Sequence, residues 1–408
     1  MNGIPELLSP AGDLEKLKMA LIYGADAVYC AGKAFGLRAG AGNLTEAELK
    51  EGVLFAHQRG KKVYVTVNII PHNEDLEDLP AYLCFLGELG VDGLIVADPG
   101  VISIAQETVP HLPLALSTQA SAVNWRSVQF WQRQGIKRII LARELSYQEI
   151  AAIKEKTDIE LEAFVHGAMC MAYSGRCLLS MYLTGRDANR GDCAQPCRWG
   201  YNVVEEKRPG EYFPLEEDER GAYIFNSKDL CLIEYIPQLV ELGLASLKIE
   251  GRMKGIHYVA TVTRVYRQAL DTYKSDPEGY ELHPQWLEEL AKVSHRDYTT
   301  GFFLQSPTGD DHIYKSSKYR ATHDFIGLVK EYDHKQGQAL VEQRNPFAVG
   351  EKIEITGPGA ETFSYLLADM YTEEGSRIAN APHPQQLVRI STPQPVKPYA
   401  LVRRAKEG

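Results

Sequence analysis

The chain has 408 residues, of which 44% are hydrophobic and 24% charged, and its formal net charge is −10. This length suggests one large domain of about 250 residues with a smaller second one. The acidic balance argues against a protein that relies on non-specific phosphate contacts, although nucleic acid can still be a substrate. The sequence shows no run of about 18 apolar residues and no signal-peptide pattern, so a cytoplasmic protein without a membrane span is expected.

Residues 1–250 alternate short apolar runs with amphipathic helical stretches. The runs are continuous, as in VYVTV and RIILA, which is typical of strands covered on both faces. The predicted strands are Glu6–Ser9, Asp26–Cys30, Lys62–Asn68, Gly93–Asp98, Leu114–Gln119, Arg138–Arg143, Glu160–His166, Ala222–Asn226 and Ser246–Glu250.

The helices between these strands carry recognisable boundary residues. Capping boxes, N-caps and terminal glycines are predicted at Thr45 with Glu48, Ser146 with Glu149, Asp13, Asn124, Gly90 and Gly135. Repeated βα units predict a parallel sheet, and their number predicts an α/β fold of the (β/α)8 TIM-barrel type. A doubly wound open sheet is the alternative, but no GxGxxG follows the first strand, which weakens its dinucleotide-binding form.

The alternation breaks in residues 167–221. A cysteine-rich stretch and the polar segment EEKRPGEYFPLEEDERG occupy this range, which we interpret as an insertion at the end of a barrel strand. The barrel domain, including the insertion, is expected over 1–275, followed by a connector over 276–320. Short strands with turns then predict a small all-β barrel over 321–408.

Working residues in parallel βα folds lie at the carboxyl ends of strands. His166 and Asn226 fall at such ends and are the candidate catalytic residues, and Arg143 and Arg252 fall there too. Each residue taken singly is explained equally well as a helix cap or a strand-end hydrogen bond. The insertion begins directly after His166, however, so two signals point to the same mouth of the barrel.

Four of the seven cysteines form the pattern C-x6-C-x15-C-x3-C at Cys170, Cys177, Cys193 and Cys197. Four thiolates suit tetrahedral zinc or an iron–sulfur cluster. Neither pair has the C-x2-C spacing of zinc ribbons, so a 4Fe–4S cluster is favoured. Cys231 follows another strand end and is the alternative fourth ligand. A nucleophilic cysteine paired with His166 is a further possibility, and buried structural cysteine is the simplest one.

The segment EAFVHGAMCMAYSGRCLLS, residues 162–180, resembles the signature of the collagenase-like peptidases, family 32 of the peptidases of unknown catalytic type. The resemblance continues in ELLSPAGDLEKLKMALIYGADAVY, GDCAQPCRW, NSKDL and SLKIEGR, and covers about residues 4–275. Some members of the family are described as proteases. Others are oxygen-independent hydroxylation proteins that carry a 4Fe–4S cluster and act on a tRNA wobble uridine, a ribosomal RNA cytidine or the ubiquinone ring.

The chain looks most similar to the tRNA branch, and the resemblance implies a tRNA hydroxylase that makes 5-hydroxyuridine. It implies cluster ligands at the four grouped cysteines, prephenate as oxygen donor, tRNA as partner and, in some relatives, a paralogous second subunit. Prephenate is a dicarboxylate, so Arg143, Arg176 and Arg252 are the candidates to bind it.

Two other functions stay open. The first is a collagenase-like peptidase, although no GxSxG motif and no acid pair or metal-bound water can be assigned in the sequence. The second is a non-catalytic, metal-stabilised subunit of a modification complex, whose metal would be needed for folding only.

Overall fold

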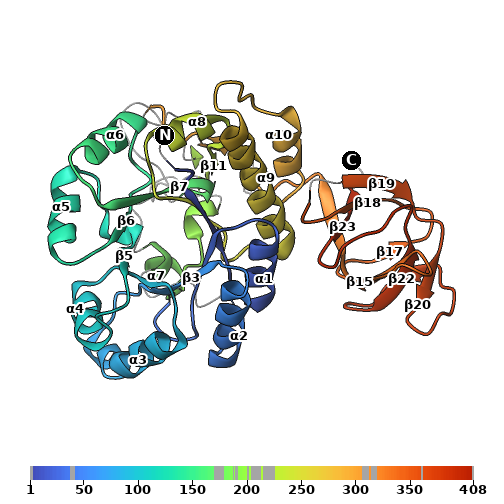
Figure 1. The fold of residues 1–408 in the computed structure, drawn as a ribbon, viewed down its shortest axis with the longest axis horizontal. Helices are drawn as coiled ribbons and strands as arrows, with labels where there is room; N and C mark the ends of the chain where they lie inside the picture. Colours follow the sequence, from blue (N-terminus) through green and yellow to red (C-terminus); the bar gives the residue numbers. More distant parts are fainter. Residues whose placement is uncertain are drawn as a thin grey trace.

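The computed structural model describes residues 3–36, 42–169, 179–186, 188, 192–199, 202–203, 213–214, 226–305, 312–313, 319–359 and 362–406. Figure 1 shows a barrel ringed by helices and, beside it, a separate body made of strands. None of the helices within these ranges is both long and apolar enough to cross a membrane.

Eight parallel strands form the barrel. Strands β1 to β7 pair in chain order, and β12 pairs with both β7 and β1, which closes the sheet. The closed ring confirms the (β/α)8 prediction and excludes the open sheet. The strands are β1 (Glu6–Pro10), β2 (Ala27–Cys30), β3 (Lys62–Val67), β4 (Gly93–Val96), β5 (Leu114–Leu116), β6 (Arg138–Ile140), β7 (Glu160–Ala168) and β12 (Ser246–Ile249).

Helices surround the barrel and cover its apolar strands. They are α1 (Leu14–Ile22), α2 (Glu46–His57), α3 (Leu79–Leu89), α4 (Pro99–Thr108), α5 (Trp125–Arg133), α6 (Tyr147–Glu155), α8 (Ile236–Glu241) and α9 (Ile256–Ser275), with 3-10 turns η1 (Asn73–Leu76), η2 (Thr118–Ala120) and η5 (Ile233–Tyr235). The predicted caps are confirmed. Side chains of Asp13, Thr45, Asn124 and Ser146 accept backbone N–H bonds. Gly90 and Gly135 have φ values of 76° and 85°, which favour glycine.

The predicted barrel strand at Ala222–Asn226 is wrong. Only Asn226 of this range is described, and it belongs to β10 (Asn226–Ser227), which pairs with β14 (His312–Ile313) outside the barrel. The strand that follows the insertion, β11 (Asp229–Cys231), runs antiparallel to the end of β7. The barrel strands all run parallel to one another, whereas β11 runs antiparallel to β7. β11 is therefore not a barrel strand, and β12, which is parallel to β7, is the eighth strand of the barrel.

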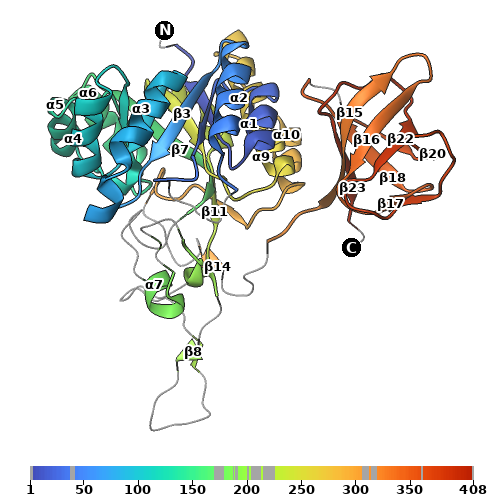
Figure 2. The same ribbon diagram turned by 90° about the horizontal axis from the view of Figure 1, so that it is seen from below.

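The described parts of the insertion project from the mouth of the barrel (Figure 2). They are α7 (Leu179–Thr184), η4 (Pro196–Arg198), β8 (Asn202–Val203) and β9 (Phe213–Pro214). The described residues of the connector after α9 include regular elements. It contains α10 (Pro284–Ala291), which buries Trp286 and Leu290 in the barrel core, and β13 (Tyr298–Thr299), which pairs with β11.

The C-terminal part is all-β, as predicted. Its seven-stranded antiparallel sheet has the order β19-β18-β23-β15-β16-β22-β20, and β17 pairs with β21. The strands are β15 (His323–Asp333), β16 (Gln338–Gln343), β17 (Phe347–Ala348), β18 (Lys352–Thr356), β19 (Thr362–Leu366), β20 (Met370–Thr372), β21 (Asn380–Ala381), β22 (Leu387–Ser391) and β23 (Leu401–Ala405). They enclose their own core of Val, Ile, Ala, Leu, Phe and Met side chains.

Apolar contacts and buried charges join the two domains. Met19 and Ala260 from the barrel helices pack against Leu328 and Leu401. Within this interface the buried Arg403 guanidinium bonds both Glu289 oxygens at 2.7 Å. Burial alone would raise the pKa of Glu289, but Arg403 and Arg264 lower it to about 2.

The barrel interior holds a second group of buried charges. Glu162 of β7, only 1% exposed, accepts from Lys248 of β12 at 3.0 Å and from Arg138 of β6 at 3.3 Å. Arg138 also bonds Glu6 of β1 at 2.7 Å. Burial lowers the pKa of Lys248. Since an unpaired charge in this interior would be costly, each member of the group depends on the others.

We expect Glu162→Gln to lower the free energy of unfolding by about 3–5 kcal/mol, because it leaves two buried cations without their shared anion. The control is Glu160→Gln on the same strand. Glu160 also bonds Arg138, but it is 56% exposed, so its loss should cost about 1 kcal/mol or less. Chemical denaturation measures both. Equal losses for the two variants would contradict the analysis.

Stability should also fall at acid pH through Glu289. Its native pKa of about 2 lies below the ordinary 4.5, so the ionised form favours the folded state. This contribution is complete above about pH 4.5 and disappears as the pH falls towards about 2. Glu289→Gln should therefore flatten the acid limb of stability against pH, whereas the exposed neighbour Glu288→Gln should leave it unchanged.

Candidate functional site

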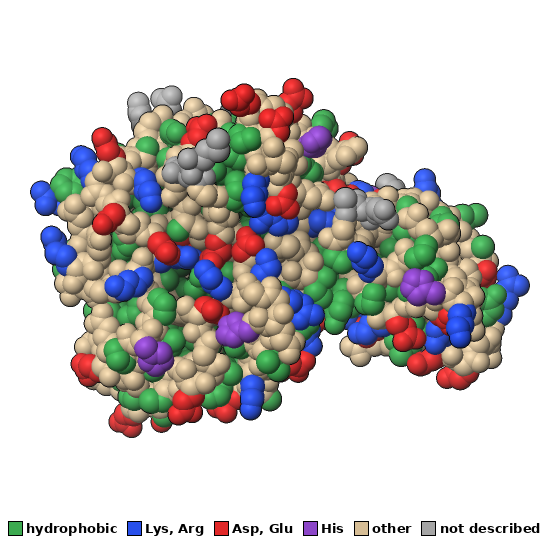
Figure 3. Space-filling view, viewed as in Figure 1, with side chains coloured by type: hydrophobic (Ala, Val, Ile, Leu, Met, Phe, Trp, Pro, Cys, Tyr) green, Lys and Arg blue, Asp and Glu red, His purple; other side chains and the backbone are tan. Residues whose placement is uncertain are grey.

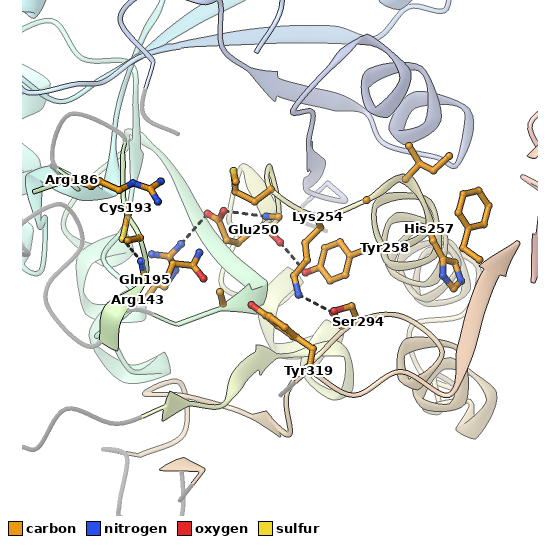
Figure 4. A pocket seen from close by; sticks show the side chains of 17 residues that line it. Arg143, Arg186, Cys193, Gln195, Glu250, Lys254, His257, Tyr258, Ser294 and Tyr319 are labelled. Atoms are coloured by element: carbon orange, nitrogen blue, oxygen red, sulfur yellow. Dashed lines mark hydrogen bonds and ion pairs between the residues drawn. The ribbon is translucent and has the colours of Figure 1, made fainter. Parts of the chain in front are cut away.

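A pocket of about 620 Å³ lies at the carboxyl end of the barrel strands. Its walls come from the β6–α6 loop, the end of β7, the β12–α9 loop, the insertion, the connector and the C-terminal domain (Figure 4). Its volume is within the range of small-molecule and nucleotide sites. The prediction that the strand ends and the insertion share one mouth is consistent with this arrangement.

Arg143 and Glu250 form an ion pair in the pocket. Nη2 of Arg143 lies 3.2 Å from Oε2 of Glu250, and the guanidinium rests on the Phe164 ring at 3.8 Å from its centroid. The backbone N–H of Gly251 donates to Oε1 of Glu250 at 3.1 Å. The Arg143 side chain is 6% exposed and that of Glu250 18%, so the pair is held firmly and still reaches the cavity.

Lys254 supplies a second cation to the pocket wall. Its Nζ donates to the Ser294 carbonyl at 2.8 Å. It lies 3.8 Å from the ring centroid of Tyr319 and 5.1 Å from that of Tyr258. Aromatic faces attract ammonium groups, so these contacts fix the side chain between the β12–α9 loop and the connector.

The insertion contributes Arg186 and the segment from Cys193 to Gln195 to the pocket. The Sγ of Cys193 accepts the backbone N–H of Gln195 at 3.4 Å, and Gln195 adopts a left-handed conformation with φ 56°. The 3-10 turn that follows carries Cys197. Hydrogen bonds to sulfur tune the thiolate ligands of metal clusters, and a bond of this kind is present at Cys193.

Three predicted site residues, Cys170, Cys177 and Arg176, lie outside the described residues. Within the described ranges, the His, Cys, Asp and Glu side chains form no group of three or more that could hold a metal. The four-cysteine site therefore stays a prediction. Of its four predicted ligands, the structure describes Cys193 and Cys197.

Cys231 and His166 are not among the residues that line the pocket. They are opposite each other in the β11–β7 pairing, and both are buried. Burial raises the pKa of the Cys231 thiol to about 12. The His166 ring stands among Tyr258, Tyr266 and Tyr298, with centroids 5.3 to 5.9 Å away. Burial lowers the pKa of His166 to about 3, so its ring is neutral.

Arg252 is also buried and is not among the residues that line the pocket. Its guanidinium donates to Asn43 at 2.6 Å and to Thr66 at 3.2 Å, which ties the loop after β2 to β3. Asn226 is described only through its backbone in β10. The catalytic roles predicted for His166 and Asn226 and the substrate role predicted for Arg252 thus stay predictions, whereas Arg143 lines the pocket.

Two pocket residues were not singled out from the sequence as substrate contacts. Glu250 directly follows the last barrel strand, β12, and Lys254 lies within the β12–α9 loop. The segment SLKIEGRMKG is the part of the sequence that could have indicated these two residues, since it places several charged residues directly after an apolar strand. Which of these charges enters the cavity depends on the loop conformation, and sequence periodicity does not report it.

Comparisons with known proteins agree with this architecture. The sequence profile of peptidase family U32 matches residues 12–313, and that of the U32 C-terminal domain matches residues 321–403. The tRNA hydroxylation protein P1 of Bacillus subtilis is 46% identical and covers 98% of this chain and 95% of its own length. The tRNA hydroxylation protein P of Escherichia coli is 40% identical, with coverages of 99% and 97%.

A third relative is the Escherichia coli 23S rRNA 5-hydroxycytidine C2501 synthase. It is 37% identical over 330 residues, which are 79% of this chain and 48% of that protein. Both the barrel with its insertion and the C-terminal domain fall within the matched profiles. The chain belongs to peptidase family U32.

Proposed function

We propose that this chain is a tRNA-modifying enzyme that hydroxylates the wobble uridine at C5 without molecular oxygen, in the cytoplasm. The observation that carries the proposal is the match to the Bacillus subtilis tRNA hydroxylation protein P1 over nearly the whole of both chains. A match of this extent includes the insertion, the connector and the C-terminal domain, all of which contribute to the pocket.

The chemistry of the pocket supports a hydroxylase better than a peptidase. A peptidase needs an activated nucleophile or a general base with a pKa near neutrality. The pocket histidine, His257, stacks on Phe325 with ring centroids 5.7 Å apart, and burial lowers its pKa to about 3. His166 has a similarly low pKa. Neither ring is suited to accept a proton near neutral pH.

We assign a 4Fe–4S cluster to Cys170, Cys177, Cys193 and Cys197. The cluster would supply one-electron redox chemistry at the wall of the pocket. Cys197 is favoured over Cys231 as the fourth ligand because it lies in the 3-10 turn that follows the Cys193–Gln195 segment, whereas the Cys231 thiol is enclosed near Tyr266 with a raised pKa. Thiolates are the form that binds metal, and a high pKa opposes it.

The oxygen donor would be prephenate. Arg143, Lys254 and Arg186 bring positive charge to the pocket, where carboxylates can bind. Arg143 and Arg176 keep their proposed roles in donor binding. Arg252 would act indirectly, through the loop that it holds at Asn43.

The tRNA would approach the mouth of the barrel. On the face shown in Figure 3, acidic and basic side chains are interspersed over both domains, so attraction of RNA would have to be local. In the basic segment LVRRAK, Arg403 is buried against Glu289 and Arg404 pairs with Glu351. These arginines therefore form ion pairs within the protein. A paralogous subunit could extend the RNA-binding surface.

Anaerobically purified protein should contain about four iron atoms per chain. Iron should be lost in Cys193→Ala and Cys197→Ala and retained in Cys231→Ala, because Cys193 lines the pocket and Cys197 lies in the 3-10 turn that follows it, whereas Cys231 is buried. The exposed Cys84→Ala controls for loss of a thiol. Iron and sulfide analysis with a visible spectrum measures this. A colourless protein with one zinc would contradict the cluster assignment.

Cells that lack the gene should lose 5-hydroxyuridine from their tRNA, and the wild-type gene should restore it. The new oxygen should carry no label when such cells are grown under ¹⁸O₂, since the proposed donor is not molecular oxygen. Mass spectrometry of tRNA nucleosides measures both. Unchanged 5-hydroxyuridine in a strain without any other family member would refute the tRNA role.

A further inference from the structure

The short helix α7 of the insertion has a polar side chain on its inner face and apolar side chains on its outer face. Its buried residue is Ser180, whereas Met181, Tyr182 and Leu183 are 50%, 87% and 40% exposed. Surface helices of globular proteins show the opposite arrangement, with apolar residues towards the core and polar residues towards water. Packing within this chain therefore does not explain the three exposed apolar residues of α7.

Two hydrogen bonds tie α7 and the residues after it to the part of the insertion that lines the pocket. The Ser180 hydroxyl accepts the backbone N–H of Ala194 at 3.0 Å, and Nε of Arg186 donates to Asp192 at 2.8 Å. Ala194 and Arg186 both line the pocket. Each residue of an α-helix turns by about 100°, so Tyr182 projects from the side of α7 opposite to Ser180. The exposed face thus has a fixed place beside the pocket.

Exposed large hydrophobic side chains are concentrated in this part of the molecule. Of the eleven that are exposed among the described residues, four belong to the insertion, namely Met181, Tyr182, Leu183 and Trp199. A fifth, Met253, is 49% exposed and lines the pocket from the β12–α9 loop. Single exposed hydrophobic residues are ordinary on a protein surface, but a group of them marks a surface that binds a partner.

The charges beside this face favour a polyanion as the partner. Among the described residues that line the pocket, Arg143, Arg186 and Lys254 are cationic and Glu250 is anionic. Arg186 pairs with Asp192, but its side chain is 46% exposed. A single-stranded nucleic acid offers both kinds of matching group, because its phosphates are anionic and the faces of its unpaired bases are apolar.

The size of the face favours single bases over a second protein chain. A stable protein interface uses about 800 Å² and about 20–30 residues from each partner. The outer face of α7 consists of three side chains. One aromatic ring is enough to hold one base, by contrast, since stacking acts base by base. Proteins that recognise RNA loops hold their unpaired bases in this way.

We infer that the outer face of α7 binds unpaired nucleotides that flank the target nucleotide in the RNA loop, with Tyr182 as the residue on which a base stacks. Met181 and Leu183 extend the apolar surface beside the ring. A loop held there has its target nucleotide next to the pocket, on the side of the barrel from which the insertion projects (Figure 2). The inference rests on the proposed function, because it requires an RNA substrate.

The test is equilibrium binding of the full-length, anaerobically purified protein to two RNA hairpins at one salt concentration. Both hairpins have the same stem and a loop with a central uridine. In the second hairpin, the nucleotides on both sides of this uridine lack their bases. The wild type should bind the intact hairpin about fivefold or more tightly than the abasic one, because the latter has no flanking base to stack on Tyr182.

Tyr182→Ala should bind the intact hairpin as weakly as the wild type binds the abasic one, and the abasic hairpin should bring no further loss. Tyr182→Phe keeps the ring and should retain the wild-type affinities. The control is Phe130→Ala on α5, because Phe130 is 48% exposed and does not line the pocket. This variant should bind both hairpins as the wild type does.

Equal affinity of the wild type for the two hairpins would overturn the inference, even if Tyr182→Ala failed to fold. Additive losses from Tyr182→Ala and from the missing bases would overturn it too, since the ring and the bases would then act independently. A wild-type oligomer that dissociates in Tyr182→Ala, with hairpin binding unchanged, would assign the face to a second copy of the chain. These three results leave the proposed function standing. Failure of the wild type to bind any hairpin or whole tRNA would refute the proposed function together with the inference.

Discussion

The Glu162 carboxylate, enclosed between Arg138 and Lys248, connects the strands at which the barrel closes. These side chains come from β7, β6 and β12, and β12 is the strand that completes the ring. Above them the Phe164 ring contacts both Lys248, at 5.4 Å, and Arg143, at 3.8 Å. Arg143, which lines the pocket, is thus linked through the Phe164 ring to a group of buried charges that are tolerable only while all are paired.

The remaining walls are added by segments that the barrel itself does not require. The β11 strand returns along the end of β7 and brings β13 and the connector to the mouth. Lys254 then joins the β12–α9 loop to this connector through Ser294 and Tyr319. The C-terminal domain, anchored by the buried Arg403, adds Phe325. A pocket assembled in this way depends on domain docking as much as on the barrel.

Side chains of the same type differ in their environment because the fold buries some of them and leaves others at the pocket. Cys193 lies at the pocket with a backbone hydrogen bond to its sulfur, while Cys231 is enclosed in the core near Tyr266. His166 precedes the cysteine-rich segment, yet its ring turns into a tyrosine-lined interior where it stays neutral. Proximity in sequence to a reactive segment is therefore weak evidence for a place in the site, since alternate residues of a strand face opposite sides.

Short-range sequence signals predicted the strands that do form the barrel, the helix caps and the all-β C-terminal part, because apolar periodicity and capping are properties of short segments. They also predicted a barrel strand at Ala222–Asn226 that the fold does not contain. The position of Arg143 at a strand end was equally readable. The sequence did not predict the antiparallel strand β11, the burial of Arg252 or the orientation of His166. Each of these depends on which segments come into contact once the barrel has closed. Glu250 belongs to both groups. Its position at a strand end could be predicted from the sequence. Only the tertiary structure places Arg143 and the Gly251 N–H in contact with its carboxylate and so orients it.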